Sequence, residues 1–171
     1  DKILPAAGQA VALLADDEPA FMGAAAGILT TDQGPKVASA ELEIDGSAVR
    51  LAGMAKGAGM IGPNMATMLA LVMTDAALAT EDAQVALARA IEQSFNCISV
   101  EGHTSTNDTV LLLASGANGT APLSGESLEQ FCRALDSLCI ELARQIPADG
   151  EGSSHLITID VRGVPSSADA R

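Results

Sequence analysis

The chain has 171 residues, of which 48% are hydrophobic and 2% aromatic, so one domain with an aliphatic core is expected. A formal net charge of −13 argues against nucleic acid and anionic membrane surfaces as partners, because both are bound through basic patches. No apolar run approaches the roughly 20 residues of a membrane-spanning helix, and three cysteines without metal-type spacing indicate reduced, buried thiols in a cytoplasmic protein.

The first third of the chain predicts two helices and a hairpin. Residues 6–15 and 19–29 are rich in Ala and predict helices, the second with Pro19 in its first turn. Residues 38–45 alternate apolar and polar side chains, which predicts a half-buried strand. Asp45-Gly46 is a typical hairpin turn and predicts a return strand towards Ala55.

The next segment combines glycines with a buried strand. Residues 56–64 hold three glycines after Lys56, but the Gly-Lys-Ser/Thr ending of a phosphate-binding loop is missing. The run from Met65 to Met73 is apolar except for Thr67 and predicts a strand buried on both faces.

The remaining elements alternate between helix and strand. Thr80 is predicted to cap a helix whose buried stripe is Val85, Ala88, Ile91 and Phe95. A strand over 109–114 follows. A long helix is then predicted from Ser124 or Ser127 to Pro147, with a last strand at 157–161 and a polar tail at 166–171. We therefore expect a layered α/β sandwich, because this fold covers the buried strand on both faces.

Three segments carry unusual polar residues near strand or helix ends, where α/β proteins tend to place their sites. They are Thr67, the hydroxyl and amide cluster at 104–109, and the Asp-Gly-Glu-Gly stretch at 149–152. On pattern alone, each also has an ordinary explanation: a buried strand Thr with its hydroxyl satisfied, a turn whose hydroxyls bond the backbone, and an exposed loop. The pattern therefore establishes only an acidic α/β domain.

Four blocks resemble the ornithine acetyltransferase family, also called bifunctional glutamate N-acetyltransferases, of arginine biosynthesis. The longest block is contiguous and runs from Lys56 to Leu69, KGAGMIGPNMATML. Leu29-Thr30-Thr31-Asp32, the block at 104–109 and the block at 149–152 follow the same order as in the family. The resemblance covers nearly the whole chain.

The resemblance implies a self-cleaving enzyme. In that family the precursor cuts an Ala–Thr bond, here Ala66–Thr67, so 1–66 would end an α chain and 67–165 would begin a β chain within one α/β domain. Thr67 would be the catalytic nucleophile, and Thr30, Lys56 and Glu151 match substrate-contacting positions. The implied fold is an αββα sandwich similar to N-terminal nucleophile hydrolases.

The implied reaction moves an acetyl group from N2-acetylornithine to glutamate. The resemblance implies no cofactor and no metal, although acetyl-CoA could also serve as a donor. The assembly implied is a heterotetramer of two α and two β chains. A Thr hydroxyl is a weak nucleophile and needs a base. Cleavage would expose the α-amine of Thr67, whose ordinary pKa of about 7.7–8.0 suits that task.

The sequence also departs from the family. His103 stands where an acidic residue is usual and His155 where a lysine is usual. Family residues of the oxyanion hole precede this segment and further substrate residues follow it, so the chain is expected to be an internal piece. Two alternatives stay open: an aminopeptidase or amidase of similar fold, and an uncleaved, non-catalytic α/β module.

Overall fold

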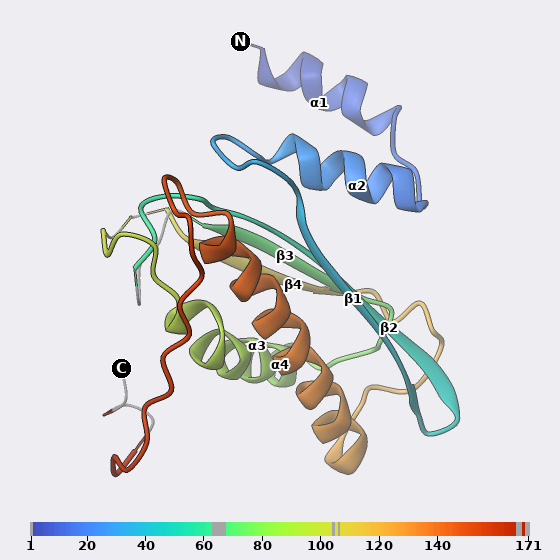
Figure 1. The fold of residues 1–171 in the computed structure, drawn as a ribbon. Coiled ribbons are helices and arrows are strands. Elements are labelled where there is room, and N and C mark those ends of the chain that lie inside the picture. The colour runs from blue at the N-terminus through green and yellow to red at the C-terminus, as the bar shows by residue number, and fades with distance from the viewer. Residues whose placement is uncertain (1, 63–67, 104, 106, 167–168, 170–171) are drawn as a thin grey trace.

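The computed structural model describes residues 2–62, 68–103, 105, 107–166 and 169 of the chain. Helices and strands are both present, and the predicted α/β class is confirmed (Figure 1). In chain order the elements are α1 (Ile3–Val11), α2 (Glu18–Gly27), β1 (Lys36–Ile44), β2 (Ser47–Lys56), β3 (Leu69–Thr74), α3 (Thr80–Gln93), a 3₁₀ turn η1 (Phe95–Cys97), β4 (Thr109–Ala114) and α4 (Gly125–Ala148).

The four strands form one sheet in the order β1-β2-β3-β4. The predicted hairpin is confirmed: β1 and β2 pair antiparallel around Asp45 and Gly46, whose φ angles of 52° and 75° are those of a tight hairpin turn. β3 pairs antiparallel with β2, with Lys56 opposite Leu69, and parallel with β4, with Leu69 opposite Thr109. Lys56 and the start of β3 therefore meet at one end of the sheet.

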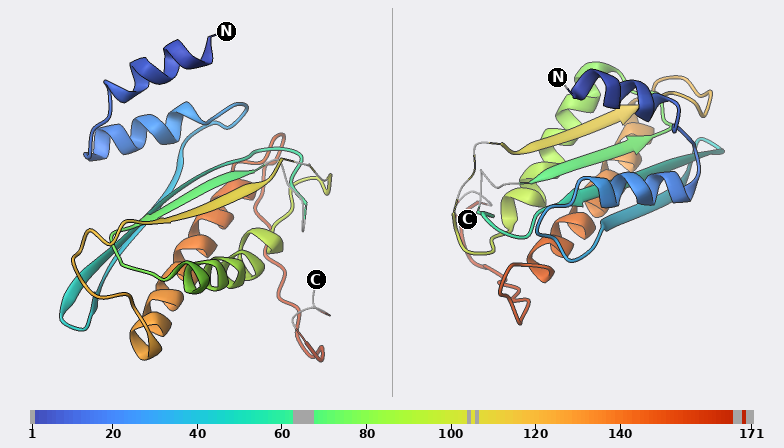
Figure 2. Two further views of the ribbon diagram at one scale, coloured as in Figure 1. Left: turned by 180° about the vertical axis from the view of Figure 1, so that it is seen from behind. Right: turned by 90° about the horizontal axis from the view of Figure 1, so that it is seen from above.

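Helices α3 and α4 cover one face of this sheet, as both views in Figure 2 show. The predicted long helix is present as α4, and its Phe131, Leu135 and Leu142 are completely buried. A Cβ atom on Gly53 of β2 would lie 2.7 Å from Cδ1 of Leu142. This glycine therefore allows α4 to lie close against the middle of the sheet.

The prediction that the strand from Met65 to Met73 is buried on both faces is wrong for the part described, which begins at Met68. Ala70 and Val72 are buried beneath the helices, but Leu69 is 42% exposed on the opposite face, and Leu111 and Leu113 of β4 are 51% and 53% exposed. Helices α1 and α2 lie on that side (Figure 1), yet α1 buries no side chain. The described residues thus supply one β layer and one main α layer of the expected sandwich.

The predicted stripe of α3 is shifted around the helix. Val85 is 70% exposed, and Ala86, Leu87 and Ala90 are buried instead. In an alanine-rich helix two neighbouring faces satisfy the 3.6-residue period, so periodicity alone cannot select one. Thr80 is the first helical residue and not the cap.

Two further predictions are wrong. Residues 157–161 form no strand, and Ile157 and Ile159 are 78% and 81% exposed, because none of the described strands pairs with this segment. Cys97 is exposed, whereas Cys132 and Cys139 are buried as expected. Burial raises the pKa of the Cys139 thiol to about 12. Among the described residues, no helix combines the length and the apolar character needed to cross a membrane.

Candidate active site

One cavity gathers all three predicted substrate residues. Its volume is about 380 Å³, and its lining comprises Thr30, Thr31, Lys56, Ala58, Gly59, Met60, Glu101 and Glu151. Thr30 precedes β1, Lys56 ends β2 and Glu151 follows α4, so the fold brings together three segments that are far apart in the sequence. Ala66 and Thr67, the predicted cleavage site and nucleophile, lie outside the described residues.

Lys56 provides the cation of this cavity. Its side chain is 9% exposed, and its Nζ donates a hydrogen bond to Thr30 Oγ1 at 2.7 Å and lies 3.9 Å from Asp32 Oδ2. An ammonium group has three N–H donors, and Thr30 is the one hydrogen-bond acceptor of Lys56 among the described residues. The remaining donors can serve an anion in the cavity.

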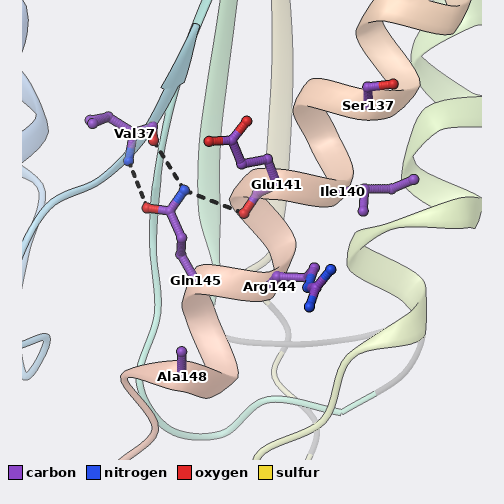
Figure 3. Close-up of a pocket in the computed structure, with 7 residues that line it drawn as sticks. All are labelled: Val37, Ser137, Ile140, Glu141, Arg144, Gln145 and Ala148. Atoms are coloured by element: carbon purple, nitrogen blue, oxygen red, sulfur yellow. Dashed lines mark hydrogen bonds between the residues drawn. The ribbon is translucent and has the colours of Figure 1, made fainter. Parts of the chain in front are cut away.

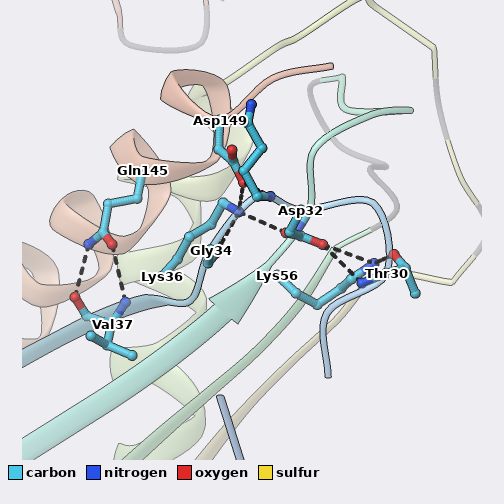
Figure 4. A network of polar contacts seen from close by, with 10 residues as sticks. Thr30, Asp32, Gly34, Lys36, Val37, Lys56, Gln145 and Asp149 are labelled. Atoms are coloured by element: carbon cyan, nitrogen blue, oxygen red, sulfur yellow. Dashed lines mark hydrogen bonds and ion pairs between the residues drawn. The ribbon is translucent and has the colours of Figure 1, made fainter. Parts of the chain in front are cut away.

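Asp32 is the buried centre of the network that holds Lys56 (Figure 4). Its side chain is completely buried and accepts hydrogen bonds from Lys36 Nζ at 2.7 Å, from Gly57 N at 2.6 Å and from Thr30 N at 3.3 Å. Burial raises the pKa of this carboxyl, but the three hydrogen bonds lower it more, so the net shift is downward. Asp32 therefore stays ionised beside Lys56.

Lys36 links this centre to the end of α4. Its Nζ donates to Asp149 Oδ2 at 2.6 Å, and the same carboxylate oxygen accepts from Gln33 N at 3.0 Å. One turn earlier, Gln145 bonds both the N–H and the C=O of Val37 at 3.1 and 3.0 Å. The start of β1 and the end of α4 are thereby fixed to each other.

Glu151 is placed by the turn that follows α4. Its amide nitrogen donates to the carbonyl oxygen of Ala58 at 2.7 Å. A Cβ atom on Gly59 would lie 3.2 Å from the carboxyl carbon of Glu151 and 3.3 Å from Oε2. The Glu151 carboxylate thus packs directly on Gly59, where a larger residue would crowd it.

The start of β3 is held by Asp108 and Thr109, the last two residues of the polar block. The amide nitrogen of Met68, the residue after Thr67 in the sequence, donates to Asp108 Oδ1 at 3.1 Å, and Met68 O accepts from Thr109 N at 3.1 Å. Leu69 then pairs with Lys56. The end of the polar block, the cavity lysine and the residue that follows the predicted nucleophile therefore meet in one region.

A larger groove of about 570 Å³ runs along the outer face of α4 (Figure 3). It is lined by Val37, Ser137, Ile140, Glu141, Arg144, Gln145 and Ala148. None of the predicted site residues lies there, and its amide side chain, Gln145, already bonds the backbone of Val37. The smaller cavity is therefore the candidate active site.

No metal centre is found in the part of the chain that the structure describes, where no three His, Cys, Asp or Glu side chains form a group that could hold an ion. The two histidines that depart from the family pattern are at the surface. His103 is 78% exposed, with Nδ1 3.7 Å from Glu101 Oε1, and His155 Nδ1 lies 2.8 Å from Ser154 Oγ.

Several residues of the site are missing from the sequence-based prediction. Lys36 and Glu101 are not singled out there, and Asp32 and Asp149 enter only as parts of motifs. Lys36 and Asp149 are separated by 113 residues, so no local pattern could pair them. Glu101 precedes the polar block by three residues and carries no signal beyond that neighbourhood.

The ArgJ family model matches residues 1–171. The chain is 42% identical over 173 residues to "Arginine biosynthesis bifunctional protein ArgJ, mitochondrial" of Schizosaccharomyces japonicus, covering 100% of this chain and 40% of that protein. It is 47% identical over 150 residues to the ArgJ protein of Synechocystis sp., covering 86% and 36%. It is 50% identical over 146 residues to the ArgJ protein of Lactococcus lactis, covering 84% and 37%.

A crystal structure of the ArgJ protein of Bacillus halodurans is 41% identical and aligns with 49% of this chain and 40% of that one, at a TM-score of 0.47. The chain spans about two fifths of the length of the curated relatives that it matches. The match of the family model over the whole chain, together with identities of 42–50% to these relatives, shows that the chain belongs to the ArgJ family.

Proposed function

We propose that the protein containing this chain is an acetyltransferase that moves an acetyl group from N2-acetylornithine to glutamate through an acetyl-Thr67 enzyme. The names of its relatives place them in arginine biosynthesis and support this class of reaction. The observation that carries the proposal is the cavity in which Thr30, Lys56 and Glu151 meet. It lies where β2 ends and β3 begins, and Met68 of that region directly follows Thr67 in the sequence.

The chemistry of the cavity fits N2-acetylornithine. This donor carries one carboxylate and one side-chain ammonium. The Lys56 ammonium can bind the carboxylate, and the Glu151 carboxylate can bind the ammonium. Because Thr30 Oγ1 accepts its hydrogen bond from Lys56, its own O–H is left to donate to a substrate oxygen.

Self-cleavage prepares the nucleophile in this proposal. The Thr67 hydroxyl attacks the carbonyl carbon of Ala66, the peptide C–N bond breaks, and the hydroxyl proton passes to the released amine. Water then hydrolyses the resulting ester, which leaves a carboxylate on Ala66 and a free α-amine on Thr67. Once neutral, that amine can act as the base for the next attack, which an amide nitrogen cannot do.

Acetyl transfer then takes two steps. Thr67 Oγ attacks the acetyl carbonyl of N2-acetylornithine, the C–N bond breaks, and the amine of ornithine takes up the proton and leaves. The amine of glutamate attacks the acetyl ester, the C–O bond breaks, and the proton returns to Thr67. This exchange predicts ping-pong kinetics.

Two finer assignments belong to the same proposal. Cleaved chains assemble as two α and two β chains, and the protein works in the cytoplasm. Two relatives carry the word mitochondrial in their names, so the compartment varies across the family.

The proposal is tested with the full-length protein and N2-acetylornithine that carries an isotope-labelled acetyl group. Denaturing mass spectrometry should find one labelled acetyl group on a chain that begins at Thr67, and glutamate should remove it. Discharge by water as fast as by glutamate would identify an amidase. An uncut chain that never takes up label would identify a non-catalytic module.

Gly59→Ala should weaken binding of the donor because the new Cβ meets the Glu151 carboxyl at 3.2–3.4 Å and displaces it. We expect the KM for N2-acetylornithine to rise by roughly three- to tenfold with a smaller change in kcat. Steady-state kinetics of the full-length protein measure this. Gly23→Ala is the control, because a Cβ there meets nothing within 4 Å. Equal KM values for the Gly59→Ala variant and the parent would refute this role of Gly59.

A further inference from the structure

The candidate cavity holds a second carboxylate besides Glu151. Glu101 lines the same cavity from the loop between η1 and β4, and its side chain is 34% exposed. We propose that Glu101 is a specificity-determining residue that, with Glu151, favours substrates ending in an ammonium group over substrates ending in a carboxylate. This inference rests on the proposed acetyl transfer.

The loop that carries Glu101 is fixed on one side to the glycine-rich segment after β2. Val100 N donates to Ile61 O at 3.0 Å, and Ser99 Oγ donates to the same oxygen at 3.3 Å. A Cβ atom on Gly62 would lie 3.2 Å from His103 O, so the two backbones are in close contact. The position of Glu101 is therefore set by packing on both sides of it in the sequence.

The same loop also packs against the turn that carries Glu151. A Cβ atom on Gly150 would lie 2.9 Å from Cγ1 of Val100, so only glycine leaves room for this contact. Glu151 is bonded to Ala58 O on the other side of that turn. Glu101 and Glu151 thus come from two loops that pack against each other at one cavity.

The charges around the cavity are unequal. The charged side chains among its described lining residues are one lysine, Lys56, and two glutamates, Glu101 and Glu151. Lys56 can take the carboxylate that N2-acetylornithine and glutamate share. What remains is a carboxylate pair, which attracts a side-chain ammonium and repels a side-chain carboxylate.

The two substrates of the proposed reaction differ in this end group. N2-acetylornithine ends in an ammonium, and glutamate ends in a carboxylate. Glu101 therefore strengthens binding of the donor and weakens binding of the acceptor. His103 also faces Glu101, at 3.7 Å, but it is 78% exposed, so solvent screens this pair.

The test compares Glu101→Gln with the parent in the full-length protein. The KM for N2-acetylornithine should rise and the KM for glutamate should fall, each by roughly two- to fivefold, the range for one partly exposed charge. Glu101→Asp keeps the charge and should restore most of the difference. Glu43→Gln, at the exposed hairpin end of β1, makes the same change of charge away from the cavity and should alter neither value.

A second measurement needs no turnover. Calorimetric titration of N2-acetylornithine and N-acetylglutamate into the Thr67→Ala variant, with and without Glu101→Gln, should show affinities that move in opposite directions. Two KM values or two affinities that move together, or do not move, would overturn the role of Glu101. Absence of acetyl transfer in the parent would overturn the proposed reaction, while the titration would still decide what Glu101 does.

Discussion

Thr67→Ala should abolish acetyl transfer in the full-length protein. The oxygen of the Thr67 hydroxyl carries the acetyl group in the proposed reaction, so the variant lacks the nucleophile. We expect the rate of glutamate acetylation to fall by about 10³-fold or more. The measurement is the initial rate of N-acetylglutamate formation at saturating N2-acetylornithine.

Thr67→Ser is the matched control for this substitution. It keeps a hydroxyl at the same position and loses only a methyl group, so both cleavage and a measurable part of the transfer rate should remain. A Thr67→Ala variant that transfers acetyl groups at the rate of the parent would show that the nucleophile is another residue.

Lys36→Met should destabilise the fold strongly. Lys36 is 2% exposed and bonds two carboxylates, Asp32 at 2.7 Å and Asp149 at 2.6 Å. Methionine has a similar length but leaves the buried charge of Asp32 without its closest cation. Removal of one partner of a buried ion pair costs about 3–5 kcal/mol, and chemical denaturation should show a loss of this size.

Arg50→Met is the control for charge alone. Arg50 also lies on a strand and pairs with Glu41 at 3.0 Å, but both side chains are more than 60% exposed. Solvent screens such a pair, so its loss should be within the error of the same measurement. Equal destabilisation by both substitutions would contradict the account of the buried network.

Acid should act on the same network in the parent. The folded-state pKa of Asp32 lies below its ordinary value of 3.8, because the hydrogen bonds outweigh burial. The contribution of Asp32 to stability is therefore complete when the pH is above that ordinary value. It is lost as the pH falls through the lower, folded-state pKa. Lys36→Met should reduce the part of the acid-induced loss of stability that comes from protonation of Asp32.

Local signals predicted the hairpin and the long helix correctly. Asp45-Gly46 determines its own turn, because both residues adopt positive φ readily, and α4 has a buried stripe broad enough to identify its face. The prediction of a strand at 157–161 was wrong because that segment has no local signal that fixes its structure. A strand forms only with a pairing partner, and an alternating sequence does not supply one.

The site was predicted only in part. Pattern alone left Thr30, Lys56 and Glu151 as ordinary loop and strand residues, and the family resemblance selected them before the structure placed them in one cavity. The residues that hold them were not found, because the Lys36–Asp149 contact joins segments 113 residues apart. Glu101 is visible as a cavity residue only once two loops are packed together.

The central claim is that Thr67 becomes the first residue of a new chain and then acts as the nucleophile. The most direct test is the denaturing intact mass of the full-length protein beside its Thr67→Ala variant. We predict two fragments that meet at Ala66 and Thr67 in the parent and a single uncut chain in the variant. A parent that remains one uncut chain while it transfers acetyl groups would contradict the claim.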